Sequence, residues 1–175
     1  MSSTHRTGTV MYVIAILGFI ALMAWLFTGE LAEQRNPNRD LAGATGSTGQ
    51  AAVVLARNRA GHYVASGRIN GVEAEFIVDT GATDVAVSAD VARAAGLSRG
   101  PAHPVTTANG QAMAYATRID TLALGDIVER DVRASIVPDM RGIDVLLGMS
   151  FLHRLDFQQR GDELLLEQRA GAQSL

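Results

Sequence analysis

The chain has 175 residues, 47% of them apolar and 19% charged, and a formal net charge of −3, which suits one ordinary domain with an appendage and excludes two large domains. It contains no Cys, and all 15 of its basic residues are Arg, so disulfides, thiol nucleophiles, cysteine-ligated metal sites and lysine-based catalysis are excluded. The acidic charge balance also argues against binding to nucleic acid.

The first element is an uncharged apolar run from Val10 to Phe27. Its length is about the minimum for a helix that crosses a ~30 Å hydrocarbon core. A cleaved signal peptide is the competing interpretation, but the run is longer than the apolar region of such peptides, and no clear small-x-small cleavage site follows it. We therefore expect a transmembrane helix over residues 10–27.

The charges on either side of this run predict its orientation. His5 and Arg6 precede it, whereas Glu30 and Glu33 follow it, so the positive-inside rule places residues 1–9 in the cytoplasm and the rest of the chain outside. Residues 28–50 are rich in Gly, Asn and Thr and have almost no apolar periodicity. This composition predicts a flexible linker.

From about residue 51 the chain changes to short runs rich in Val, Ile, Leu, Tyr and Phe, which indicate β structure. Asn70-Gly71 stands between two such runs, residues 62–69 and 72–78, and is the strongest short hairpin signal because a type I′ turn needs positive φ at both central positions. Asn109-Gly110 joins a second pair, residues 105–108 and 111–115. Further strands are expected over residues 117–124, 131–137, 155–158 and 163–168.

Helix is sparse in this region. Ser88 can cap a short helix that runs to Ala95 and stops at Gly96, and residues 150–154 are expected to form another. The pattern predicts a mainly β fold, a small closed or folded-over sheet with one or two short helices. We assign this domain to residues 51–170 and a C-terminal tail to residues 171–175.

The segment Phe76-Ile-Val-Asp-Thr-Gly-Ala-Thr83 carries a carboxylate, that of Asp79, from an apolar strand straight into a turn. A charge next to apolar strands is costly unless other groups hold it, so such an Asp indicates a functional site. Asp-Thr-Gly at a strand end is also an ordinary turn. The tripeptide alone leaves both interpretations open.

A second segment, Ile143-Asp-Val-Leu-Leu-Gly-Met-Ser-Phe-Leu152, favours the functional interpretation. Together with Phe76-Ile-Val-Asp-Thr-Gly-Ala82 it resembles the retropepsin-like aspartic proteases, specifically their membrane-anchored single-domain bacterial group. The resemblance extends over about residues 52–168 and includes both Asn-Gly hairpins. It implies a small closed β-barrel in which the strand Leu146-Leu147-Gly148 lies beside the Asp79 loop and the next helix packs beneath it.

In this family each chain supplies one Asp, and the site forms where two chains meet on a two-fold axis. This chain has one Asp-Thr-Gly, and its nearest second candidate, Asp120-Thr121, is followed by Leu122 where Gly is required. The resemblance therefore implies a homodimeric endopeptidase that needs no metal or other cofactor. Two Asp79 carboxylates would share one proton, activate a water and protonate the carbonyl of a protein or peptide substrate.

The resemblance also implies roles for individual residues. Thr80 would reach the partner loop, and Gly81 would allow close backbone approach. The Asn109-Gly110 hairpin would be a flap over an extended peptide, unless it is an ordinary surface hairpin. The expected catalytic residues are Asp79, Thr80 and Gly81, and the expected substrate-binding residues are Ala82, Thr83, Asn109 and Gly110.

The chain departs from viral relatives at two places. They carry a second Asp where Thr83 stands and Arg-Asn where Met149-Ser150 stand, which puts in doubt the ion pairs that steady those dimers. The resemblance and the apolar run together predict a bacterial inner-membrane protein with its C-terminal domain in the periplasm.

Other functions have weaker support. Gly148-Met-Ser-Phe-Leu152 begins like a nucleophile elbow but lacks its final Gly. His153 is too close to Ser150 in the sequence to complete a catalytic triad. The four His residues are scattered without the spacing of a zinc site. The remaining alternative is a non-catalytic peptide-binding or dimerisation module in which Asp79 is a turn residue.

Overall fold

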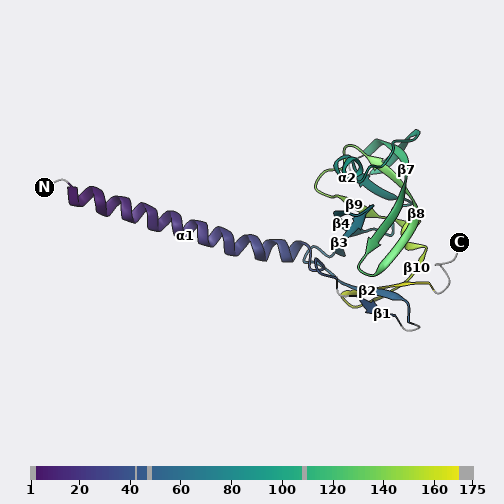
Figure 1. The fold of residues 1–175 in the computed structure, drawn as a ribbon, viewed down its shortest axis with the longest axis horizontal. Coiled ribbons are helices and arrows are strands. Elements are labelled where there is room, and N and C mark those ends of the chain that lie inside the picture. The colour runs from purple at the N-terminus through teal and green to yellow at the C-terminus, as the bar shows by residue number, and fades with distance from the viewer. Residues whose placement is uncertain (1–2, 42, 47–48, 108–109, 170–175) are drawn as a thin grey trace. The chain divides into compact units, whose positions relative to one another are not determined.

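A computed structural model describes residues 3–41, 43–46, 49–107 and 110–169, with side chains from residues 11–26 and from residue 33 onward. The chain forms two compact units, Met1–Arg35 and Asn36–Leu175. Figure 1 shows the first as one helix and the second as a mostly β domain. The tail predicted for residues 171–175 lies outside the described residues.

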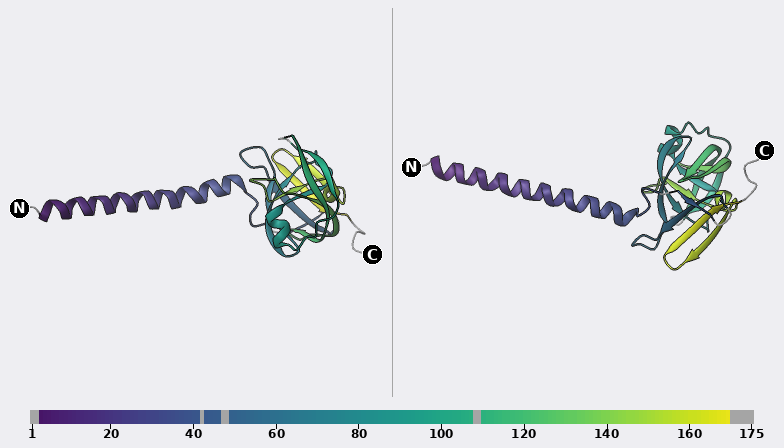
Figure 2. Two further views of the ribbon diagram at one scale, coloured as in Figure 1. Left: turned by 90° about the horizontal axis from the view of Figure 1, so that it is seen from above. Right: turned by 60° about the horizontal axis from the view of Figure 1, so that its bottom comes forward.

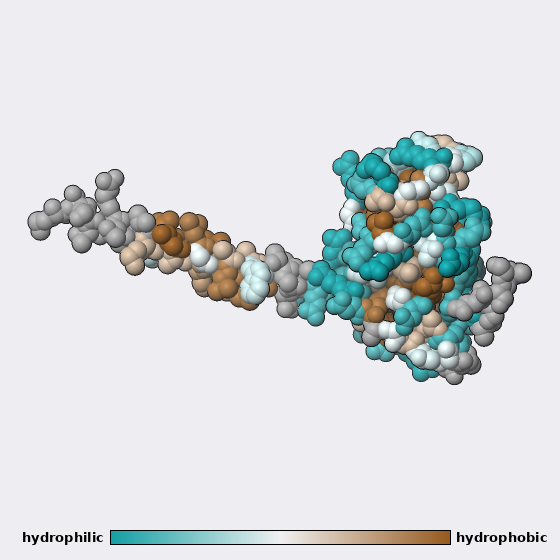
Figure 3. All heavy atoms as spheres, in the orientation of Figure 1, coloured by the Kyte–Doolittle hydropathy of each residue, from teal (hydrophilic) through white to brown (hydrophobic). Residues whose placement is uncertain are grey.

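The first unit is helix α1, Ser3–Arg35. Its side chains from Met11 to Leu26 are almost all apolar, and most of the large ones are exposed, which gives this stretch its hydrophobic colour in Figure 3. Among the described residues, no helix is long and apolar enough to cross a membrane. The predicted helix is confirmed, whereas the predicted span over residues 10–27 is not supported by the part of the chain that the structure describes.

The described residues of the second unit form eleven strands and two short helices. The helices are α2 (Ala89–Ala94) and α3 (Met149–Leu152). The strands are β1 (Ala44–Thr45), β2 (Ala51–Ala56), β3 (Val64–Ile69), β4 (Val72–Val78), β5 (Val85–Ser88), β6 (Ala102–Thr107), β7 (Gly110–Leu124), β8 (Ile127–Val137), β9 (Val145–Leu147), β10 (Leu155–Arg160) and β11 (Glu163–Gln168).

The larger sheet closes into a barrel. Its strand order is β3-β4-β9-β5-β8-β7-β6, and β3 also pairs with β7, so six strands form the barrel while β6 extends it beyond β7. Gly67 makes the closure possible, because a Cβ there would lie 2.5 Å from both the Ala123 carbonyl oxygen and the Phe76 ring. The predicted mainly β, closed-barrel fold is confirmed (Figures 1 and 2).

The barrel is filled by apolar side chains from alternate positions along its strands. Phe76, Ile119 and Leu147 of these strands are fully buried in this core, and so is Phe151 of helix α3. A second sheet, with the order β1-β2-β11-β10, adds Val53 and Leu55 of β2 and Leu166 of β11 to the same core. Burial of this apolar surface is the main driving force that holds the short strands together.

Local turn signals predicted several elements correctly. Asn70 and Gly71 have φ values of +49° and +85° in the turn between β3 and β4, as a type I′ turn requires. The hydroxyl oxygen of Ser88 accepts a hydrogen bond from the Val91 amide and caps α2, and Gly96 follows the helix with φ of +68°.

Several predicted strands were too short. The predicted strands over residues 111–115 and 117–124 form one 15-residue strand, β7, because no turn-forming residue separates them. Its partner β8 begins at Ile127 rather than at Asp131, directly after the turn at Gly125, where φ is +58°.

The structure also differs from the flexible linker predicted for residues 28–50. Helix α1 extends to Arg35, and β1 pairs with β2. Between them Asn36 and Asn38 are buried, and the Asn38 side-chain amide bonds to the backbones of Ala56 and Val64. Hydrophobic periodicity did not reveal this contact because hydrogen bonds of polar side chains, and not an apolar face, make it.

Candidate active site

Asp79 follows β4 at the point where β4 leaves the barrel. β4 runs parallel to β9, with Val78 opposite Leu147, and the Asp79 amide donates a 3.0 Å hydrogen bond to the Leu147 carbonyl oxygen. The apolar residues of both strands thus fix the backbone immediately before the carboxylate. The strand that contains Leu146 and Leu147 thus lies beside the Asp79 loop, as the family resemblance implied.

The loop itself orients the carboxylate. The Gly81 amide donates a 2.9 Å hydrogen bond to Oδ1 of Asp79, which leaves Oδ2 for another partner. A Cβ on Gly81 would lie 3.2 Å from the same Oδ1, tighter than an ordinary contact. Asp79 is half-buried, whereas Thr80, Gly81 and Thr83 are exposed, so the loop presents a partly shielded acid beside an accessible surface.

Helix α3 holds the far side of this loop. The amides of Met149 and Ser150 donate hydrogen bonds of 2.8 and 2.9 Å to the carbonyl oxygens of Ala82 and Thr83. These are the free N–H groups of a helix start, which need acceptors. The loop and the helix therefore form one hydrogen-bonded unit, and Ala82 is half-buried within it.

The Ser150 hydroxyl joins this unit to the barrel. It accepts a 2.9 Å hydrogen bond from the Val85 amide and donates one of 2.7 Å to the Arg133 carbonyl oxygen. Because backbone groups occupy the hydroxyl in both directions, the structure favours a structural role for Ser150 over a nucleophilic one. His153 is the residue at which α3 ends. This position further weakens the serine hydrolase alternative.

An ion pair that the sequence analysis missed lies next to the loop. Nε of Arg133 lies 2.7 Å from Oδ1 of Asp84, whose side chain is 28% exposed. The pair joins residues that are far apart in the sequence, and neither residue belongs to a motif that would have identified it. It supplies a local ion pair in a chain that has Thr83 and Met149-Ser150 in place of the charged residues of viral relatives.

The predicted flap is a hairpin of β6 and β7, a separate element from the Asp79 loop. Gly110 starts β7 with φ of +108°, and its carbonyl oxygen accepts a 2.8 Å hydrogen bond from the Thr107 hydroxyl. Asn109 lies outside the described residues. The hairpin is confirmed, and its role as a flap stays a prediction.

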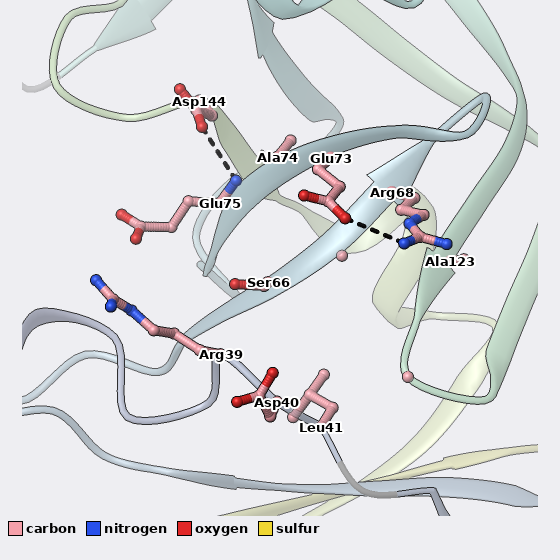
Figure 4. A pocket seen from close by; sticks show the side chains of 12 residues that line it. Arg39, Asp40, Leu41, Ser66, Arg68, Glu73, Ala74, Glu75, Ala123 and Asp144 are labelled. Carbon is pink, nitrogen blue, oxygen red and sulfur yellow. Dashed lines mark hydrogen bonds and ion pairs between the residues drawn. The ribbon is translucent and has the colours of Figure 1, made fainter. Parts of the chain in front are cut away.

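A cavity of about 870 Å³ lies apart from these elements, between the segment before β1 and strands β3 and β4 (Figure 4). Its lining includes charged side chains: Asp144 accepts a hydrogen bond from the Glu75 amide, and Arg68 pairs with Glu73. None of its lining residues belongs to the Asp79 loop. Among the described residues, no group of three or more His, Asp or Glu could hold a metal ion.

Comparison with known proteins agrees with this geometry. Residues 65–154 match the family described as "gag-polyprotein putative aspartyl protease". A solved structure of a retropepsin-like aspartic protease from Rickettsia conorii is similar, with a TM-score of 0.55 and 30% identity, over 66% of this chain and 98% of that one. The chain belongs to the retropepsin-like aspartic protease family.

Two curated relatives are similar to this chain along most of its length. An uncharacterized protein in the cobV 5′ region of Sinorhizobium sp is 34% identical over 95% of this chain and 77% of its own length. An uncharacterized protein of Rickettsia prowazekii is 26% identical over 89% of this chain and 68% of its own length. The family match over residues 65–154 and the Rickettsia conorii structure confirm the predicted retropepsin-like family, whereas the membrane-anchored part of that prediction is not confirmed.

Proposed function

We propose that this retropepsin-like chain is an aspartic endopeptidase that works as a homodimer, with one Asp79 from each copy. The observation that carries the proposal is the Asp79 loop, in which a half-buried carboxylate keeps one oxygen fixed by the Gly81 amide and the other available. The sequence contains only one Asp-Thr-Gly. A catalytic pair of carboxylates therefore requires a second copy of the chain.

The proposed chemistry follows from bringing two such carboxylates together. At about 3 Å apart they cannot both ionise, so the pair holds one proton between them. The ionised Asp79 takes a proton from a bridging water, whose oxygen attacks the peptide carbonyl carbon. The protonated Asp79 donates its proton to the carbonyl oxygen. In a second step the carboxylate that gave up its proton takes one from a hydroxyl of the resulting tetrahedral intermediate, while the other Asp79 donates its proton to the amide nitrogen. The C–N bond then breaks and both carboxyls return to their starting state, without a metal or a covalent intermediate.

The neighbouring residues take supporting roles in this proposal. The exposed Thr80 is available to the partner loop, and the half-buried Ala82 and the exposed Thr83 follow in the same loop, beside which an extended peptide would bind. Gly110, with Asn109 before it, would belong to the flap that covers the peptide with strand-like hydrogen bonds. The alternative is a non-catalytic peptide-binding or dimerisation module on the same barrel.

The predicted location at the bacterial inner membrane, with the domain in the periplasm, stays a prediction. The orientation inferred from the charges around residues 10–27 depends on that location. The proposed chemistry depends on neither, because it needs only the Asp79 loop and a second copy of it.

The decisive comparison is between the full chain and its Asp79→Asn variant, both in mild detergent with an unfolded protein as substrate, between roughly pH 4 and 7. Asn keeps an oxygen for the Gly81 amide but cannot serve as a base, so we expect cleavage to fall by at least about a hundredfold. Asp120→Asn is the matched control, since Asp120-Thr121 is the other Asp-Thr pair and Asp120 is exposed.

Two outcomes would overturn the assignment. Equal cleavage by the wild type and Asp79→Asn would show that another group is responsible. No cleavage by a wild-type chain that demonstrably dimerises would favour the non-catalytic module. Because the site needs two copies, the rate per chain should also rise with protein concentration until dimerisation is complete.

A further inference from the structure

Two charged side chains beside the Asp79 loop lie on the outer face of the barrel. Val85 of β5 pairs with Ala134 of β8, and both side chains are almost fully buried in the core. Because side chains alternate along a strand, the residues that precede these two, Asp84 and Arg133, point away from the core. They form an ion pair in which the Arg133 side chain is 61% exposed and the Asp84 side chain is 28% exposed.

The same outer face carries an apolar row next to the candidate catalytic carboxylate. Ile77, Leu146 and Ala86 are neighbours across β4, β9 and β5, and all three are half-buried. Ile77 stands two residues before Asp79, so a peptide at Asp79 would rest its side chains against this row. β8 is the next strand after β5, which places Arg133 at the border of the row.

The guanidinium of Arg133 is only partly used within the domain. Its Nε donates a 2.7 Å hydrogen bond to Oδ1 of Asp84, its one side-chain partner among the described residues. Arg118, directly opposite Arg133 on β7, differs, because two of its nitrogens bond to both carboxylate oxygens of Asp131. Arg133 therefore keeps the N–H donors of both terminal nitrogens for a ligand.

This ion pair is within reach of a peptide bound at Asp79. The Ala82 amide donates a 3.3 Å hydrogen bond to the Asp79 carbonyl oxygen, as in a turn whose end Cα atoms are less than about 7 Å apart. Asp84 follows two residues later, so its Cα lies within about 14 Å of that of Asp79. An extended peptide advances about 3.3 Å per residue, which puts the pair at most about four residues from the cleaved bond.

We propose that Arg133 is a specificity-determining residue, whose terminal guanidinium nitrogens bind the carboxylate of an acidic side chain in the substrate. That side chain belongs to a residue within about four positions of the cleaved bond. A guanidinium with both terminal nitrogens available matches a carboxylate in a two-pronged, charge-assisted contact. This inference deepens the proposed function and rests on it.

The opposite polarity, in which Asp84 binds a basic substrate side chain, is less favourable. Asp84 is the more buried member of the pair, and one of its two oxygens already accepts the Nε hydrogen bond of Arg133. A basic side chain that approached the other oxygen would also approach the exposed guanidinium. Like charges repel each other, so the pair as a whole favours an acidic ligand.

The two-fold symmetry of the proposed homodimer extends this preference to both sides of the cleaved bond. Each copy contributes one Arg133, so the two guanidinium groups lie at equivalent places on either side of the two Asp79 carboxylates. A bound peptide therefore meets an Arg133 before the cleaved bond and another after it. Acidic residues should be favoured at matching positions on the two sides.

Cleavage-site mapping is the first test. The full-length wild type in mild detergent is given a peptide mixture from a denatured proteome, and mass spectrometry identifies the residues around each cleaved bond. We expect acidic residues to be enriched at least about threefold at one position within four on each side, and Arg133→Gln to lose this enrichment. Arg68→Gln is the matched control and should keep it, since Arg68 is also 61% exposed and paired with one carboxylate, that of Glu73.

A matched pair of peptides separates recognition from mere support of the loop. A well-cleaved acidic peptide is compared with a copy in which the recognised Glu is replaced by Gln. We expect the wild type to prefer the Glu peptide at least about fivefold in kcat/KM, and Arg133→Gln to treat both alike. Asp84→Asn should instead raise the preference about twofold, because it removes the charge that competes for Arg133. An ion pair that only supported the loop would leave the ratio unchanged in both variants.

The outcomes distinguish this inference from the catalytic proposal. Asp79-dependent cleavage with no acidic preference, or with the same preference in Arg133→Gln, would overturn recognition by Arg133 and leave the endopeptidase intact. A lower preference in Asp84→Asn would contradict competition between the two carboxylates for Arg133. Cleavage that persists in Asp79→Asn, or a dimer that cleaves nothing, would reject the endopeptidase, and the role of Arg133 in its specificity would fall with it.

Discussion

Gly148 packs so closely against Asp84 that a Cβ added to Gly148 would lie 2.3 Å from the Asp84 carbonyl oxygen. The backbone of Gly148 is extended, with φ of −92° and ψ of −174°, so its conformation is open to any residue. The requirement for Gly is therefore steric. The backbones at Gly148 and Asp84 cannot easily move apart, because the carbonyl oxygens of Ala82 and Thr83 accept hydrogen bonds from the start of α3.

Gly148→Ala should therefore destabilise the domain by about 1–3 kcal/mol, the usual cost of overpacking. The clash is with backbone atoms, which cannot rotate away as a side chain can. We expect a lower urea midpoint with an unchanged slope and a parallel loss of Asp79-dependent cleavage. Wild-type stability in this variant would show that the loop moves independently of α3.

Ser150→Ala should also weaken the domain, for a different reason. It leaves the amide of the fully buried Val85 without its acceptor, and an unpaired buried donor costs about 1–3 kcal/mol. Ser150→Thr keeps the hydroxyl and should retain most of the stability, which thermal unfolding of the two variants would measure. Loss of cleavage in Ser150→Thr at full stability would instead point to a chemical role for Ser150.

The turns and caps of this fold were readable from the sequence because each depends on one or two residues. Asn70-Gly71 and Ser88 act locally, and the structure contains the turn and the cap that they predict. The pairing of strands is different, since it depends on which surfaces meet. Nothing local to β5 indicates that it lies between β8 and β9.

The same distinction applies to the site. Asp79 and Gly148 were found because a family pattern marks both. The pair of Asp84 and Arg133 was not, because the two residues meet only after β5 has aligned with β8. Sequence motifs thus identified the Asp79 loop, whereas the contacts that hold this loop in place are seen only in the folded barrel.

The carboxylate of Asp131 should make stability depend on pH. A hydrogen bond from Arg118, and secondarily the charge of its guanidinium, lowers the pKa of Asp131 below the usual value of 3.8. A lowered pKa in the folded state contributes stability above about pH 4, and this contribution is lost as the pH falls through the folded-state pKa.

We therefore expect Asp131→Asn to melt at a lower temperature than the wild type at pH 7 and the difference to shrink below about pH 4. Asn is the suitable replacement because Asp131 has φ of +51°, and Asn tolerates this conformation. Arg118→Gln should show the same pH dependence, because it removes the other member of the pair. A difference that is constant from pH 7 to pH 3 would contradict the electrostatic explanation.

Asn38 should control whether the segment after α1 stays bound to the domain. Its Oδ1 accepts a 2.7 Å hydrogen bond from the Ala56 amide, and its Nδ2 donates to the carbonyl oxygens of Ala56 and Val64 at 2.9 and 2.6 Å. No other side chain of similar size offers an acceptor and two donors in this geometry. Asn38→Ala should cost about 1–3 kcal/mol, because Val64 is buried and its carbonyl oxygen loses this donor.

Limited trypsin digestion measures this release directly. The chain has no Lys, and Arg35 and Arg39 flank Asn38, so detachment of the segment should speed cleavage at these two sites. Asn58→Ala is the matched control, since Asn58 holds the separate turn through the amides of Ala60 and His62. Faster cleavage at Arg39 in Asn38→Ala but not in Asn58→Ala is the expected result. Equal cleavage in the two variants would mean that the Asn38 hydrogen bonds do not hold the segment in place.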